Sequence, residues 1–209
     1  VLMETSSSVD GCVATPSWPS RPKGRKSLFT RSRRTATPPL NSSVRRHMNR
    51  TDTPYQLEKY IWSDEDFEVM GWHDATIWSM YADPEAFEFI FDLDYIFKWV
   101  DPEPEGTYFT FWVCPVTMVF ANVSDVVMNI ESQQGAIVVA NLLRKHVGLS
   151  PDGKFDQYAF HFQCQEGQLS LKATGYKMYV RQAPVLQKQT HLEFGTRGGV
   201  SFGRGRSDA

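Results

Sequence analysis

Residues 87–99 alternate between two kinds of side chain, and this pattern restricts the fold more than any other feature of the chain. The odd positions are all large and apolar: Phe87, Phe89, Phe91, Leu93, Tyr95, Phe97 and Trp99. The even positions are mixed and mostly polar: Glu88, Ile90, Asp92, Asp94, Ile96 and Lys98. A period of two predicts a β-strand with one face in a core and the other in a wetter environment. Asp92 and Asp94 then share the second face.

Other segments of the same kind follow at short intervals. Strand-like runs occur at 75–81, 108–113, 116–120, 126–131, 155–165, 168–174 and 176–182. Pro115 is expected to end a strand or to lie at a sheet edge, and 136–146 fits either a strand or a helix. We predict a mostly β fold, with α+β as the alternative. It would be a twisted antiparallel sheet of about 7–9 strands, folded as a sandwich or open barrel with at most one or two short helices.

The composition divides the chain into three parts. Residues 1–47 are rich in Ser, Thr, Pro and Arg and lack apolar periodicity, so we expect a disordered basic leader. A start assigned too far upstream would also produce such a segment, with Met48 as the natural start. Residues 48–202 are expected to form a single β-rich domain, and residues 203–209 a flexible Gly/Arg tail.

Charge is distributed unevenly along the chain. Residues 48–131 contain three basic and seventeen acidic residues, a net charge of −14, whereas residues 132–209 have a net charge of +5. Several Trp residues lie within the acidic segment. Such a surface suits a basic protein partner, because charge accelerates the encounter and aromatic side chains supply the lasting contacts. The same field disfavours nucleic acid.

Cysteine content and hydropathy indicate the cellular environment of the protein. The chain has 3 cysteines without a CxxC pair, which argues against a disulfide framework and a zinc ribbon. Cys114 lies among apolar residues and is expected to be a small buried hydrophobe. There is no run of about 18 apolar residues, so we expect no membrane span and a cytoplasmic protein.

Two groups of residues could carry chemistry. Trp72-His73-Asp74 places a histidine beside a carboxylate, although neighbours on a strand point to opposite faces. Asp92 and Asp94 would lie about 7 Å apart on one strand face, a spacing that permits metal binding or acid–base work. A solvated acidic face explains the pair without any chemistry and is the favoured interpretation. No motif assigns a catalytic, cofactor or metal role.

Three functional hypotheses follow. The first is a non-enzymatic bacterial binding protein, such as an immunity-type inhibitor of a toxin, that docks a basic partner through an acidic, Trp-bearing surface. Its contact residues would be Trp72, His73, Asp74, Asp92, Asp94 and Trp99. The second is an enzyme or metal-binding protein that uses His73, Asp92, Asp94 and His161. The third is a β-barrel that holds a small ligand in an internal cavity.

Three motifs also resemble segments of a family of uncharacterised bacterial proteins. They are W-H-D at 72–74, D-x-D-Y-I at 92–96 and R-G-G-x-S-F at 197–202. The resemblance spans about residues 68–202 and implies no activity. It places the family domain after the basic leader, consistent with Met48 as the natural start.

Overall fold

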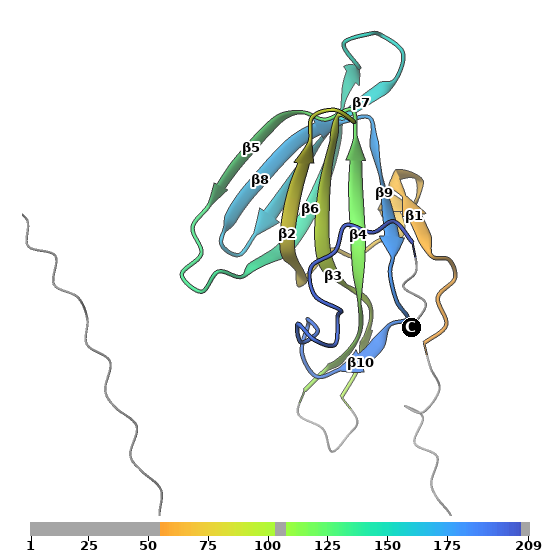
Figure 1. Ribbon diagram of the computed structural model, residues 1–209, viewed down its shortest axis with the longest axis vertical. Coiled ribbons are helices and arrows are strands. Elements are labelled where there is room, and N and C mark those ends of the chain that lie inside the picture. The colour runs from red at the N-terminus through yellow and green to blue at the C-terminus, as the bar shows by residue number, and fades with distance from the viewer. Residues whose placement is uncertain (1–54, 103–107, 206–209) are drawn as a thin grey trace, which may run out of the picture. The chain divides into compact units, whose positions relative to one another are not determined.

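The computed structural model describes residues 55–102 and 108–205 (Figure 1). The expected leader, residues 1–47, and the last residues of the expected tail lie outside this part of the chain. Within it, none of the helical segments has the length and apolar character needed to cross a membrane.

The described residues form ten strands and one short helix, joined by turns and loops. The prediction of a mostly antiparallel β fold is confirmed. The strands are β1 (Ile61–Ser63), β2 (Ala75–Asp83), β3 (Glu88–Val100), β4 (Thr110–Ala121), β5 (Ser124–Ile130), β6 (Ile137–Leu149), β7 (Asp156–Cys164), β8 (Gly167–Ala173), β9 (Gly175–Val180) and β10 (Val185–Gln187). The ambiguous segment 136–146 belongs to strand β6. A 3-10 helix, η1 (Asp64–Val69), follows Ser63, whose side chain caps it.

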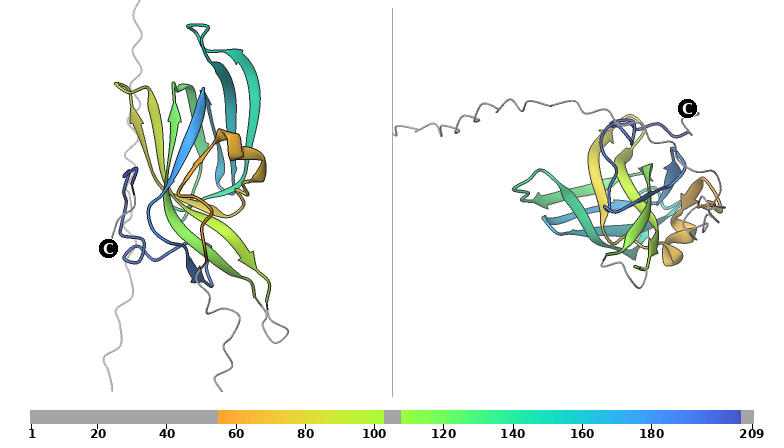
Figure 2. Two further views of the ribbon diagram at one scale, coloured as in Figure 1. Left: turned by 90° about the vertical axis from the view of Figure 1, so that its right-hand side faces the viewer. Right: turned by 90° about the horizontal axis from the view of Figure 1, so that it is seen from below.

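All ten strands belong to one open antiparallel sheet. Its order is β1-β9-β4-β3-β2-β6-β7-β8-β5, and β10 pairs with β4. β2 joins the two halves through only a short pairing, Ala75–Ile77 with Ile137–Val139. The sheet curls strongly at this junction, so that its two halves face each other (Figure 2).

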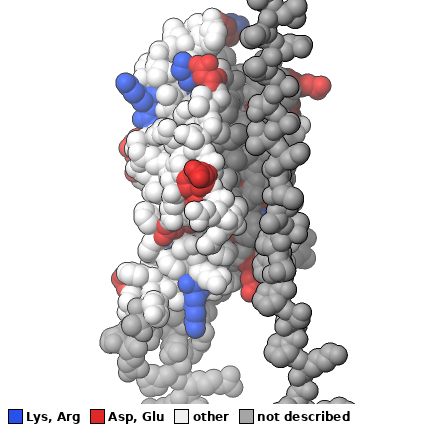
Figure 3. Space-filling model, turned by 90° about the vertical axis from the view of Figure 1, so that its left-hand side faces the viewer, with Lys and Arg blue, Asp and Glu red and all other residues white. Residues whose placement is uncertain are grey.

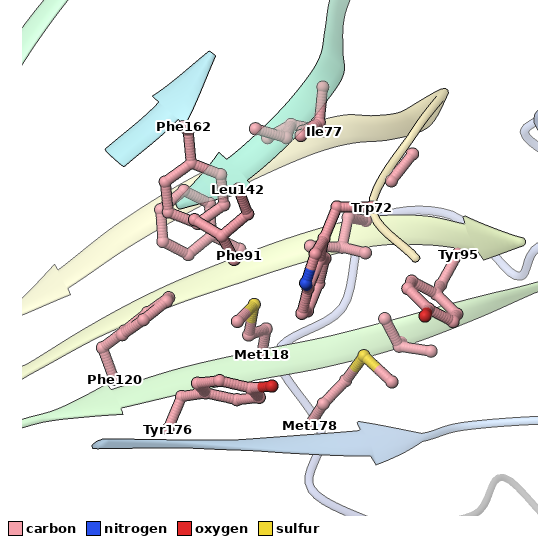
Figure 4. Close-up of a cluster of buried hydrophobic side chains, with 14 of the residues drawn as sticks. Trp72, Ile77, Phe91, Tyr95, Met118, Phe120, Leu142, Phe162, Tyr176 and Met178 are labelled. Carbon is pink, nitrogen blue, oxygen red and sulfur yellow. The ribbon is translucent and has the colours of Figure 1, made fainter. Parts of the chain in front are cut away.

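An aromatic core fills the space inside the curl. Phe91 of β3 stacks on Phe162 of β7 at a centroid distance of 5.0 Å, and Phe120 of β4 meets Phe160 of β7 at 4.9 Å. Figure 4 shows Phe91, Phe120 and Phe162 converging from different strands. All four rings are fully buried, and an interior packed in this way does not resemble the ligand cavity that the barrel hypothesis needs.

The alternation of β3 holds in its centre and fails at its ends. Residues Phe89 to Tyr95 at odd positions belong to the core, as predicted. Phe87 is exposed in the preceding turn with φ of 56°. A β-bulge between Ile96 and Lys98 shifts the register against β4, and Trp99 beyond it is 41% exposed.

Pro115 lies inside β4 rather than at its end. The carbonyl of Pro115 accepts a hydrogen bond from the Arg181 amide at 3.1 Å. In a β-strand, the N–H and C=O groups of one residue point to the same side. Proline has no N–H group, and at Pro115 this side faces the gap between the end of β9 at Val180 and the start of β10. The expected end of a strand at Pro115 is therefore wrong, whereas the expected edge position holds locally, because the neighbouring strand is interrupted there.

The two described cysteines are expected to resist alkylation. Burial raises the pKa of Cys114 well above its ordinary value, and burial followed by the charge of Glu166 raises that of Cys164 to about 11. At pH 9, we expect Cys164 to react about fifty-fold more slowly in the folded chain than in guanidinium chloride, because only the thiolate reacts. Peptide mapping after a timed iodoacetamide pulse measures both sites. Equal rates in folded and unfolded chain would contradict this.

Candidate functional site

Asp92 and Asp94 are completely buried, with 0% exposure. The expectation that they lie on an exposed acidic docking surface is therefore wrong. The even face of β3 is covered by residues 190–201 of the C-terminal segment, which hydrogen-bond to both carboxylates. The wetter face that the alternation predicted is a second buried layer.

Two arginines neutralise these carboxylates. Arg197 donates from Nη2 to Asp92 Oδ1 at 2.5 Å and from Nε to Asp94 Oδ1 at 3.2 Å. Arg181 also donates to Asp92. We call Asp92, Asp94, Arg181 and Arg197 the buried charge cluster. It balances two negative and two positive charges in a site where a lone charge would be very costly.

The buried charge cluster anchors the C-terminal segment to the sheet. The backbone amides of Leu192 and Ser201 donate to Asp94 and Asp92 at 2.8 and 3.0 Å. Arg181 Nη1 donates to the Ser201 carbonyl at 2.8 Å. Burial opposes the charge of Arg197, but the hydrogen bonds and charges of Asp92 and Asp94 together raise its pKa above the ordinary value. The buried charge cluster therefore has a structural role, because it holds the C-terminal segment on the sheet.

Sequence reasoning missed Arg181 and Arg197 as partners of the acidic pair. Arg197 begins the R-G-G-x-S-F motif, and Ser201 is its serine. Two aspartates within an otherwise aromatic strand were the available signal, because buried carboxylates need basic partners.

The acidic character of residues 48–131 is partly cancelled by the rest of the chain. Glu68 pairs with Arg144 at 3.1 Å, and Glu88 pairs with Arg204 of the expected flexible tail. The face in Figure 3 has both acidic and basic side chains scattered among uncharged ones. Part of the charge asymmetry in sequence is thus compensated by ion pairs between residues 48–131 and residues 132–209.

The Trp72-His73-Asp74 motif divides between core and surface. Trp72 is 5% exposed and packs edge-on against Tyr95 and Tyr176 at 5.4 and 5.9 Å. It is a core residue, so its expected part in an exposed docking surface is wrong. His73 is exposed, and its Nδ1 lies 3.1 Å from Asp74 Oδ1.

The enzyme or metal hypothesis required His73, Asp92, Asp94 and His161 to converge. Among residues 55–102 and 108–205, no three His, Cys, Asp or Glu side chains form a group able to hold a metal ion. Both carboxylates of the proposed set are already occupied by arginine.

His73 and Trp99 meet at a surface pocket of about 370 Å³, which we call the aromatic pocket. Their rings contact edge to face with centroids 5.7 Å apart. After the bulge in β3, Trp99 lies opposite Phe111 of β4, and their rings meet with centroids 4.9 Å apart. Val69 of η1 and residues before β1 complete the wall. The residues lining the pocket are Tyr55, Glu58, Trp62, Val69, Met70, Gly71, His73, Tyr95, Ile96, Phe97, Lys98 and Trp99.

The aromatic pocket combines ring faces with few charges. Glu58 and Lys98 are its charged lining residues. Burial, with a smaller contribution from the Glu58 charge, raises the pKa of Tyr55, and burial raises that of Tyr95, so both phenols stay neutral. Exposed aromatics continue beyond the rim, where Phe109 lies 5.8 Å from the Trp99 ring. Such a surface suits binding of an apolar or cationic group.

Comparisons of the chain with family models, with curated proteins and with solved structures gave no match. The resemblance to a bacterial family remains an expectation.

Proposed function

We propose that this chain is a non-enzymatic binding protein that docks a basic protein partner on the aromatic pocket. The observation that carries the proposal is the convergence of His73 and Trp99, two of the expected contact residues, at one concave surface. A lysine or arginine side chain of the partner would enter between the rings beside Glu58. An immunity-type inhibitor that blocks a bacterial toxin in the cytoplasm is the kind of protein we expect.

The ring faces of this pocket are suited to a cation. Lys59 Nζ lies over the Trp62 ring, 4.8 Å from its centroid, so this ring already contacts a cation within the chain. A cation over an aromatic face is stabilised by about 0.5–2 kcal/mol, and more when water is excluded. The exposed Trp99 and Phe109 rings around the opening would supply the lasting contacts of the interface.

Lys98 lines the same pocket and opposes an incoming cation. We therefore expect Glu58→Gln to weaken binding of the basic partner and Lys98→Ala to strengthen it. Each change should grow as ionic strength falls, because the charges are close to solvent. If both substitutions shift affinity in the same direction, the partner's contacting group is not cationic.

Site-specific photo-crosslinking tests where the partner docks. p-Benzoylphenylalanine is placed at position 99 or, as a control, at Tyr81, an aromatic residue of β2 with similar exposure. When the chain is expressed together with its basic protein partner, we expect a crosslink from position 99 and none from position 81. Crosslinking from position 81 alone, or attachment of an acidic protein at position 99, would overturn the proposal.

A further inference from the structure

Strand β5 forms one edge of the sheet and, within the described part of the chain, pairs only with β8. Its apolar residues Val127 and Met128 are more than half exposed. β5 lies on the left side of the molecule in Figure 1, and the surface seen from that side in Figure 3 is mostly uncharged. An exposed apolar edge strand is a template for pairing with another chain.

The backbone of β5 has hydrogen-bonding groups that face away from β8. The Glu131 amide donates to the Glu166 carbonyl at 2.8 Å, so the N–H and C=O groups of Asn129, two residues earlier, also point toward β8. Those of Met128 and Ile130 point the other way, toward the open edge. Each of these two residues therefore presents a donor and an acceptor that no described strand uses.

The opposite edge of the sheet is protected in a way that β5 is not. β1 has only 3 residues and leads directly into η1, and short edge strands resist pairing. β5 has 7 residues and contains no Lys, Arg or Pro. Its charged residue, Asp125, lies at a register shift against β8 and pairs with Lys172 Nζ at 2.7 Å. Residues 127–130 remain as a regular and open edge.

A second copy of β5 can satisfy these free backbone groups. When two copies pair antiparallel about a two-fold axis at Asn129, Met128 of each copy lies opposite Ile130 of the other. Every outward N–H and C=O group of these two residues then has a partner. Met128 and Ile130 form an apolar pair across the strands, and the two Asn129 amides, which both donate and accept, face each other.

Charge distinguishes this register from its neighbour. A two-fold axis at Met128 would also pair outward groups, but it would place Asp125 opposite Glu131 of the other copy. Like charges directly opposite each other destabilise a sheet. The register centred on Asn129 places no two like charges opposite each other along β5, so charge complementarity favours it.

We infer that this chain forms a two-fold dimer in which β5 pairs antiparallel with β5 of a second copy, centred on Asn129. The dimer joins the two sheets edge to edge through backbone hydrogen bonds. None of the residues that line the aromatic pocket belongs to β5. The dimer is therefore independent of the proposed partner.

Light scattering coupled to size-exclusion chromatography tests the dimer over a series of chain concentrations. The full chain is expected to approach twice the 23.9 kDa of one copy as the concentration rises. Met128→Lys should weaken the dimer about ten-fold or more, because the two introduced charges would occupy diagonal positions about 7–8 Å apart.

Val147→Lys is the matched control for this substitution. Val147 is an exposed apolar residue of β6, a strand separated from β5 by β7 and β8, so its replacement should leave the dimer unchanged. A mass that stays at one copy at every concentration would overturn the inference. Equal weakening by the two substitutions would also overturn it.

Disulfide crosslinking of the full chain tests the register. In an antiparallel sheet, residues of a non-hydrogen-bonded pair have Cα atoms about 4.5 Å apart, within the range of about 4.4–6.8 Å that a disulfide spans. Asn129→Cys is therefore expected to form disulfide-linked dimers on mild oxidation, above the level of the unmodified chain. Val127→Cys lies on the same face but about 13 Å along the strands from its counterpart, so it should form far fewer. Equal crosslinking of the two variants would overturn the inference.

Discussion

Replacing Arg197 with methionine is expected to lower the free energy of unfolding by about 3–5 kcal/mol, because it leaves buried carboxylates without their partner. Arg197 is the residue of the buried charge cluster that contacts both Asp92 and Asp94. Methionine keeps much of the length of the side chain and removes its charge and its donors. Urea denaturation followed by circular dichroism measures the change.

Arg204→Met is the matched control for this substitution. Arg204 pairs with Glu88 at the surface, and its side chain is 45% exposed. Surface ion pairs contribute about 0–1 kcal/mol, so the loss should stay below about 1 kcal/mol. We also expect Arg197→Met to make residues 188–202 sensitive to protease before the sheet unfolds. Equal losses for the two substitutions would contradict a structural role for the buried charge cluster.

Replacing Phe120 with alanine is expected to cost about 3–5 kcal/mol, since it opens a cavity in the aromatic core. The Phe120 ring is fully buried and lies 4.9–5.9 Å from the rings of four other aromatic residues in the core. These rings come from β3, β7 and β9, so the cavity would weaken contacts between the two halves of the curled sheet. Urea denaturation followed by circular dichroism measures the loss in the free energy of unfolding.

Phe155→Ala provides the comparison for the core substitution. Phe155 lies just before β7 and is more than half exposed, so we expect a change within about 0.5 kcal/mol. If Phe155→Ala proves as destabilising as Phe120→Ala, the interior is not the packed core that the structure shows.

The alternation in β3 predicts burial correctly for only one face of the strand, the aromatic one. Aromatic residues at positions 89–95 must be buried, and they are. The opposite face contains two aspartates, and a local pattern cannot tell whether water or another part of the chain covers them. Their partner Arg197 lies 105 residues beyond Asp92. Pairing at such a distance depends on the fold of the C-terminal segment, which has no periodicity of its own.

The candidate contact residues also show that local sequence does not determine which residues are buried. Trp72 and Trp99 both lie in the acidic segment, and nothing in their immediate sequence separates them. Trp72 is buried because Tyr95 and Tyr176 pack around it, whereas Trp99 is exposed because a β-bulge shifts β3 just before it. Burial and bulges arise from tertiary packing, so the sequence could nominate both residues and could not choose between them.

Capture of a cation by the aromatic pocket is the central claim of this account. It is tested by the fluorescence anisotropy of two labelled peptides, identical except that one has arginine where the other has citrulline, which is similar in shape and uncharged. We predict that the arginine peptide binds more tightly, and that Trp99→Ala weakens it about thirty-fold, the loss of about 2 kcal/mol expected for an anchoring aromatic residue. Equal binding of the two peptides, or unchanged binding by Trp99→Ala, would contradict it.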